Sequence, residues 1–141
     1  MNNKIKDLTI GLKDTIASAL RQMDRINKKL LIVIENDKYY SMLSIGDLQR
    51  AIIRGIDLNT EIKTILRDYA VVVSETDNIE QIKQRMLQRR NEYMPIISTE
   101  GKITDVVFWE DIFKEQEKLK KGNINLPVVI MAGGIGSRLK P

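Results

Sequence analysis

The sequence contains no cysteine and no histidine. Without cysteine the chain can form neither a disulfide framework nor a thiolate metal site, and it has no thiol nucleophile. The absence of histidine removes the commonest general base and the commonest transition-metal ligand. We therefore expect no metal site and no catalytic residue in this chain.

Long apolar runs and concentrated charge are also missing. The longest apolar runs, such as residues 30–34, are far shorter than a membrane span, and the N-terminus leads into no apolar signal core. The 23 basic and 19 acidic residues are spread along the chain and leave a net charge of +4, without the basic stripe of a nucleic-acid binder. These absences predict a cytoplasmic protein that binds neither a membrane nor a nucleic acid.

The composition is that of a soluble α/β protein. Of the 141 residues, 43% are apolar, 30% are charged and only 5% are aromatic. This length suits one compact domain, or two small repeats that share a core.

The first half of the chain shows a regular order of elements. Apolar residues at three- and four-residue spacing predict a helix over residues 16–26, with Thr15 or Asp14 as the N-cap. The apolar run at 30–34 predicts a buried strand, and the turn chemistry at 35–38 makes residues 39–44 its hairpin partner. A second helix is predicted to begin at about Ile45 and to end at Gly55, the residue best suited to a left-handed C-cap.

The same order returns in the second half, with strands at 70–73, 94–97 and 103–108 and helices after 78 and 110. Matching residues stand 63 positions apart, as Asp14 and Asp77 do, up to Ile34 and Ile97. One extra residue in the second hairpin turn then makes the spacing 64, as between Asp47 and Asp111. We interpret this pattern as an internal duplication.

Residues 5–120 resemble a tandem of CBS domains. The resemblance is carried by Asp14-Thr15-Ile16, the strand-turn-strand 33–44, and Ser44-Ile45-Gly46-Asp47-Leu48-Gln49-Arg50-Ala51 with Gly55. It implies an α/β (α+β) fold in which two β-α-β-β-α repeats pack as a pseudo-twofold pair. We place the first repeat at 5–57, the second at 58–120 and a linker at 121–126.

The resemblance also implies nucleotide-binding clefts between the repeats. In the family, a Ser/Thr-x-x-Asp at the start of each second helix faces a cleft, where the carboxylate holds ribose hydroxyls and the hydroxyl reaches phosphate. Ser44 and Asp47 fit this pattern, with Asp47 the stronger candidate. The same spacing also fits a helix capping box, which needs no ligand. The sequence leaves both interpretations open.

The second repeat departs from the pattern. Phe108 stands where the first repeat has the hydroxyl, while the acid is kept as Asp111, so we expect an altered or blocked cleft there. Trp109 could stack on a base, but a lone tryptophan between a strand and a helix more often serves packing or a dimer contact.

The last fifteen residues resemble a different family. Residues 127–131 read as a buried strand, and the glycine-rich loop after it matches the Gly-Gly-x-Gly-x-Arg-Leu-x-Pro motif of the sugar-phosphate nucleotidyltransferases. Glycine amides and an arginine are suited to holding phosphate. The candidate phosphate-binding residues are Gly133, Gly134, Gly136 and Arg138. We expect residues 127–141 to be the start of a truncated transferase domain, inactive by itself; a plain glycine linker is the alternative.

Together these resemblances imply a regulatory CBS pair that senses an adenine nucleotide (AMP, ADP or ATP) and is attached to a sugar-phosphate nucleotidyltransferase. That parent enzyme would use Mg²⁺ and an NTP to convert a sugar 1-phosphate into an NDP-sugar and pyrophosphate. We expect a homodimer. The alternatives are a ligand-free dimerisation platform for the same enzyme, and the CBS pair of another sugar-phosphate enzyme such as an isomerase.

Overall fold

A computed structural model describes residues 3–67 and 72–113. The predicted linker 121–126 and the predicted phosphate loop, with Gly133, Gly134, Gly136 and Arg138, lie outside the described residues. The elements are α1 (Asn3–Leu8), β1 (Thr9–Gly11), α2 (Ile16–Ile26), β2 (Leu30–Glu35), β3 (Lys38–Ser44), α3 (Ile45–Ile53), the 3-10 helix η1 (Ile62–Ile65), β4 (Val73–Ser74), α4 (Ile79–Arg89), β5 (Tyr93–Ile97) and β6 (Ile103–Phe108). Residues 109–113 are helical.

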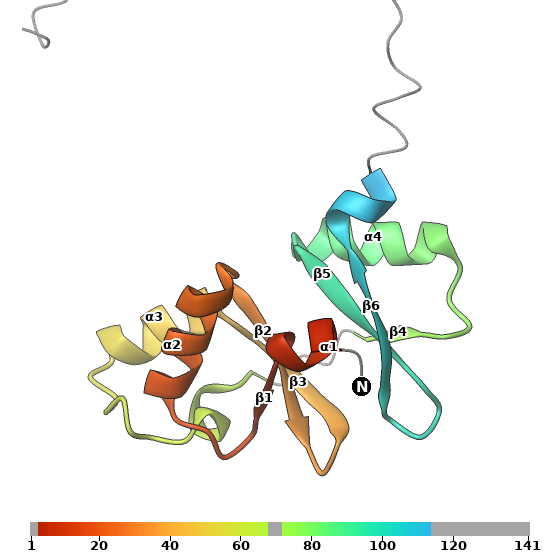
Figure 1. Cartoon of the computed structure of the whole chain (residues 1–141). Helices are drawn as coiled ribbons and strands as arrows, with labels where there is room; N and C mark the ends of the chain where they lie inside the picture. The colour runs from red at the N-terminus through yellow and green to blue at the C-terminus, as the bar shows by residue number, and fades with distance from the viewer. Residues whose placement is uncertain (1–2, 68–71, 114–141) are drawn as a thin grey trace, which may run out of the picture.

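The two halves have the same topology. Each contains a three-stranded sheet, ordered β1-β2-β3 in the first half and β4-β5-β6 in the second. In each sheet the first strand runs parallel to the second, and the third is its antiparallel hairpin partner. Figure 1 shows α2 and α3 on the outer side of the first sheet, α4 on the outer side of the second, and α1 between the halves. The predicted pair of α+β repeats is confirmed.

The duplication extends to single hydrogen bonds. The Gly11 amide donates to the Asp14 carboxylate at 2.8 Å, and the Ser74 amide donates to the Asp77 carboxylate at 2.7 Å. Both hairpins carry a register shift at the matching place, between Val33 and Ile34 and between residues 96 and 97. The extra residue lies in the second hairpin turn, as the change from 63 to 64 predicts.

The helix ends follow from local side-chain chemistry. The Thr15 hydroxyl accepts from the Ser18 amide at 3.2 Å and caps α2. At the end of α3, Gly55 has a φ of 72°, and its amide and the next one donate back into the last helical turn. Because glycine adopts positive φ at little cost, Gly55 can terminate the helix in this way. The predicted start of α2 and end of α3 are therefore confirmed.

The turn between β2 and β3 uses two non-glycine residues with positive φ, Asn36 at 51° and Asp37 at 60°. Two such residues form the turn whose twist matches that of a hairpin, and its preferred sequence is Asn-Gly. We expect Asp37→Gly to raise the free energy of unfolding by about 0.5 kcal/mol, because it relieves the left-handed conformation. Urea denaturation measures this gain. Asp37→Ala, which keeps a Cβ, is the control and is expected to give no gain.

The core of the described chain consists of three apolar clusters, one of which joins the two halves. One lies inside the first half and a second lies inside the second half. The third lies between the two sheets and contains Ile5, Leu8, Leu30, Ile32, Tyr93 and Val106. In this central cluster the Tyr93 hydroxyl donates to the carbonyl of Leu30, the residue 63 positions earlier. The two repeats therefore share an interior.

Three elements of the described chain were not predicted from sequence: α1, β1 and η1. Each is short, and each buries residues against a core formed by other elements: Ile5 and Leu8 in the central cluster, Ile10 and Ile62 in the first. Ile65 and Leu66 also pack on the first cluster, so the segment after α3 continues along the first half. The boundary between residues 57 and 58 stays a prediction.

Candidate functional site

A cleft of about 320 Å³ lies where the two halves meet. The first half contributes residues at the start of β2, the end of β3 and the start of α3, and the second half contributes the end of α4 and the turn after it. The lining residues are Leu30, Met42, Ser44, Asp47, Arg67, Gln88, Arg89 and Asn91. Ser44 and Asp47, the predicted binding pair, therefore lie in a cleft that both halves build.

Asp47 is buried in this cleft, with 6% of its surface exposed, and it accepts from four donors. Its Oδ2 accepts from the Ser44 amide at 3.0 Å and from the Ser44 hydroxyl at 2.6 Å. Its Oδ1 contacts Arg50 Nη2 and Arg67 Nε, each at 2.6 Å. The Asp47 amide in turn donates to Ser44 Oγ at 3.3 Å, which completes a capping box at the start of α3.

Opposing effects act on the charge of Asp47. Burial by itself raises the pKa of this carboxyl, whereas the hydrogen bonds from Ser44, Arg50 and Arg67 lower it. The hydrogen bonds prevail, so the pKa of Asp47 lies below its ordinary value and the side chain is a carboxylate at neutral pH.

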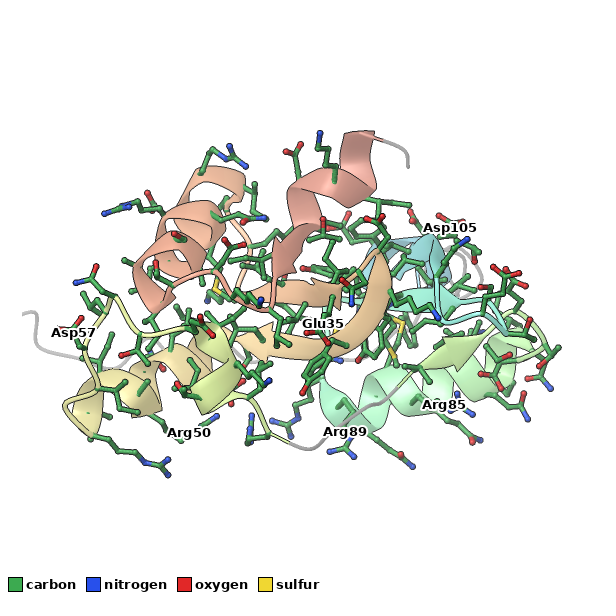
Figure 2. The ribbon with its side chains drawn as sticks, turned by 90° about the horizontal axis from the view of Figure 1, so that it is seen from below. Glu35, Arg50, Asp57, Arg85, Arg89 and Asp105 are labelled. Atoms are coloured by element: carbon green, nitrogen blue, oxygen red, sulfur yellow. The ribbon has the colours of Figure 1, made fainter. Side chains whose placement is uncertain are left out.

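Two arginines line the cleft and a third lies beside it. Arg67 comes from the segment between the halves and Arg89 from α4, while Arg50 is one turn along α3 from Asp47. In Figure 2, Arg50 and Arg89 extend along the same edge of the molecule. Arginine side chains at a cleft are suited to an anionic ligand group such as phosphate.

None of these arginines was predicted as a site residue. Arg50 could have been found, because its position three residues after Asp47 places it on the same helix face. Arg67 and Arg89 carry no such local signal. Arg67 reaches the cleft because the segment after η1 lies against the start of α3, and Arg89 because the two halves fold against each other. A single sequence without a structure shows neither approach.

A second cavity, between Phe108 of the second half and residues of the first half, has different chemistry. It measures about 540 Å³ and is lined by Asp7, Leu8, Arg25, Ile26, Lys28 and Phe108. Phe108 occupies the position that Ser44 occupies in the first repeat. Its ring packs on the ring of Tyr93, with 5.6 Å between the centroids. The cleft is therefore altered, as expected, but Phe108 does not fill it. Asp111 is exposed and lines neither this cavity nor the one beside Trp109 in the described part of the chain.

Trp109 is engaged in packing. Its ring stacks on Phe113 with 4.0 Å between centroids, and its amide donates to the Glu92 carbonyl at 2.8 Å. A neighbouring cavity of about 400 Å³ is bordered by Phe108, Trp109 and Arg90. Stacking on Phe113 uses one face of the indole, so the packing interpretation of Trp109 matches the observed contacts.

The described residues contain neither a candidate membrane span nor a cluster of metal ligands. Over 3–67 and 72–113, no helix combines the length and the apolar character that crossing a bilayer requires. Over the same residues, no three Asp or Glu side chains are grouped in a way that could hold a metal ion.

Comparison with known proteins bears directly on the fold. Residues 62–118 match the family model described as CBS domain. A CBS domain pair/ACT domain protein from Thermotoga maritima superimposes with a TM-score of 0.67 at 18% identity, over 79% of this chain and 89% of that one. The chain folds as a CBS domain pair.

Other solved structures of CBS proteins have the same fold. A CBS domain protein from Pyrobaculum aerophilum complexed with AMP matches with a TM-score of 0.65 at 16% identity, over 79% of this chain and 91% of that one. CbpB in complex with c-di-AMP matches with a TM-score of 0.66 at 15% identity, over 79% and 77%. No curated protein matches the sequence. At these identities the likeness establishes the fold alone.

Proposed function

We propose that this CBS pair is a regulatory module that binds an adenine nucleotide in the cleft around Asp47. The observation that carries the proposal is the composition of this cleft, which is lined by Arg67 and Arg89 from different parts of the chain and by the buried carboxylate of Asp47. Arginine pairs well with phosphate oxygens, and Gln88 and Asn91 supply amide donors and acceptors beside it.

The similar structures support an adenine ligand. Among them, one CBS domain protein is complexed with AMP and another, CbpB, with c-di-AMP. A ligand seated between the halves would contact both, so it would favour the arrangement in which those contacts form. Such differential affinity is what a regulatory module needs to transmit a signal.

The protein that this module regulates is, we propose, a sugar-phosphate nucleotidyltransferase. Support comes from the sequence alone, through the match of Gly133, Gly134, Gly136, Arg138 and Pro141 to the motif of that family. Reading the gene beyond Pro141 tests this, because a Pro-Lys-Pro string and further acidic residues are expected to follow. Pyrophosphate release from an NTP and a sugar 1-phosphate, in the presence of Mg²⁺, is the matching activity assay.

Arg89→Ala is expected to weaken adenine nucleotide binding about tenfold or more, because a charge-assisted hydrogen bond to phosphate contributes on the order of 1.5–3 kcal/mol. Isothermal titration calorimetry with AMP, ADP, ATP and c-di-AMP measures the effect. Arg54→Ala is the matched control, since Arg54 is an exposed arginine at the far end of α3, outside the cleft lining.

A ligand-free dimerisation platform is the second candidate, favoured by exposed apolar side chains near the end of α3. Ile53 is 82% exposed, and Ile52 and Leu58 are 48% and 43% exposed. If none of the four nucleotides gives heat while light scattering shows a homodimer, the sensor proposal is wrong and the platform is supported. Binding that Arg89→Ala weakens and Arg54→Ala preserves supports the sensor.

A further inference from the structure

Methionine is the only sulfur-containing residue of this chain, which has no cysteine. Within residues 3–67 and 72–113 the methionines are Met23, Met42, Met86 and Met94. Met23, Met86 and Met94 are buried, with at most 3% of their surface exposed, whereas Met42 is partly exposed. Because thioether oxidation follows exposure, Met42 is the methionine of this group that an oxidant in solution reaches first.

Met42 belongs both to the contact between the halves and to the cleft around Asp47. In the first hairpin it stands opposite Ile32, so the two side chains lie on the same face of the sheet. Ile32 is fully buried in the central cluster, and Met42 packs against that cluster. Met42 also lines the cleft, where it and Leu30 are the apolar members of the lining.

Oxidation changes the character of this side chain. The thioether sulfur attacks one oxygen of a peroxide, the O–O bond breaks, the sulfur keeps that oxygen as a sulfoxide, and the other oxygen leaves as water when the oxidant is hydrogen peroxide. The sulfoxide is polar, and a polar group that stays in an apolar cluster without a hydrogen-bond partner is costly. If the sulfoxide turns into the cleft instead, it replaces an apolar part of the lining.

We propose that Met42 is an oxidation site through which a peroxide weakens the packing between the two halves and lowers the affinity of the cleft for its ligand. The effect on ligand affinity rests on the proposed nucleotide binding, whereas the oxidation and its effect on the packing do not. Methionine sulfoxide reductases convert the sulfoxide back to the thioether, so the change is reversible.

Peptide mass mapping after brief treatment with hydrogen peroxide tests the site itself. Met42 is expected to gain one oxygen atom at least about tenfold faster than the three buried methionines. Similar rates at all four positions overturn the inference.

Thermal melts and calorimetry with AMP, before and after peroxide, test the consequence. In the native chain, oxidation is expected to lower the melting temperature by on the order of 4 °C and the AMP affinity by about tenfold. In Met42→Leu neither value is expected to change on treatment, because leucine has a similar volume and no sulfur. This variant keeps Met1 and Met131, so the comparison isolates Met42.

Met86→Leu is the matched control. It removes a buried methionine and keeps Met42, so its response to peroxide is expected to equal that of the native chain. Treatment of the oxidised native chain with methionine sulfoxide reductase is expected to restore both values.

Equal losses in the native chain and in Met42→Leu overturn the inference, as does an oxidised Met42 that leaves the melting temperature and the AMP affinity unchanged. Absence of heat from every nucleotide before oxidation overturns the proposed function. In that case a fall in melting temperature that Met42→Leu prevents supports the oxidation site, and an unchanged melting temperature overturns it.

Discussion

Tyr93→Ala is expected to lower the free energy of unfolding by about 3–5 kcal/mol, the range for removing a buried aromatic ring. Tyr93 is fully buried at the centre of the cluster between the two sheets, where it contacts both halves. The loss combines burial of the ring, the cavity left behind and the hydrogen bond from its hydroxyl to the Leu30 carbonyl. Urea denaturation followed by circular dichroism measures it.

Tyr93→Phe separates the ring from the hydroxyl. It keeps the packing on Phe108 and removes the donor to Leu30, so we expect a loss of about 1–2 kcal/mol. If Tyr93→Ala costs less than 1 kcal/mol, the two sheets do not depend on a shared interior. The pseudo-twofold arrangement would then need another explanation.

Asp47→Ala is expected to lower the free energy of unfolding by about 2–4 kcal/mol at neutral pH. Loss of the Asp47 half of the capping box, the carboxylate that accepts from the Ser44 amide, contributes about 1 kcal/mol. The remainder comes from the two arginines, because removing one member of a buried ion pair deprives its partners of their counter-charge. Arg50 and Arg67 are about half exposed, so water compensates in part and the cost stays below that of a fully buried pair.

The cost of Asp47→Ala should also depend on pH in a defined direction. The folded pKa of Asp47 is lowered, so its contribution is complete above the ordinary value of 3.8 and is lost as the pH falls through the folded pKa. Denaturation of the native chain and the variant between pH 7 and pH 2.5 is expected to show converging stabilities at the acid end. A constant difference would contradict the role given to the carboxylate charge.

Asp111→Ala is the matched control, because Asp111 occupies the equivalent position of the second repeat and is exposed. Exposed surface substitutions usually change stability by less than about 0.5 kcal/mol. An equal loss at both positions would show that the effect belongs to the helix start in general. It would then not arise from the contacts of Asp47.

Local chemistry explains which parts of the fold could be predicted. The helix α2 follows from apolar spacing and the Thr15 cap, and α3 from its capping box and Gly55, all of which act within a few residues. The hairpin β2-β3 follows from a turn built on Asn36 and Asp37. By contrast β1, with three residues, and η1, with four, carry too little pattern to be recognised.

In the candidate site, too, some residues could be predicted from the sequence and others could not. Ser44 and Asp47 are three residues apart and could be named from sequence. Arg67 is brought to them by the fold of the segment after η1, and Arg89 by the packing of the second half on the first. The choice between capping and ligand binding also depended on the fold. Only the structure shows that the Asp47 carboxylate already has four donors.

Sequence patterns are enough to predict the repeat of 63 and 64 residues, the order of the main helices and strands, and the α+β class, because periodicity, caps and turns are properties of neighbouring residues. Only the folding of the whole chain places Tyr93 in a core that both sheets share, brings Arg67 onto Asp47 and Arg89 into the same cleft, and lines the second cleft with different chemistry. These features depend on contacts between residues far apart in the chain, and such contacts form only when the two halves fold together.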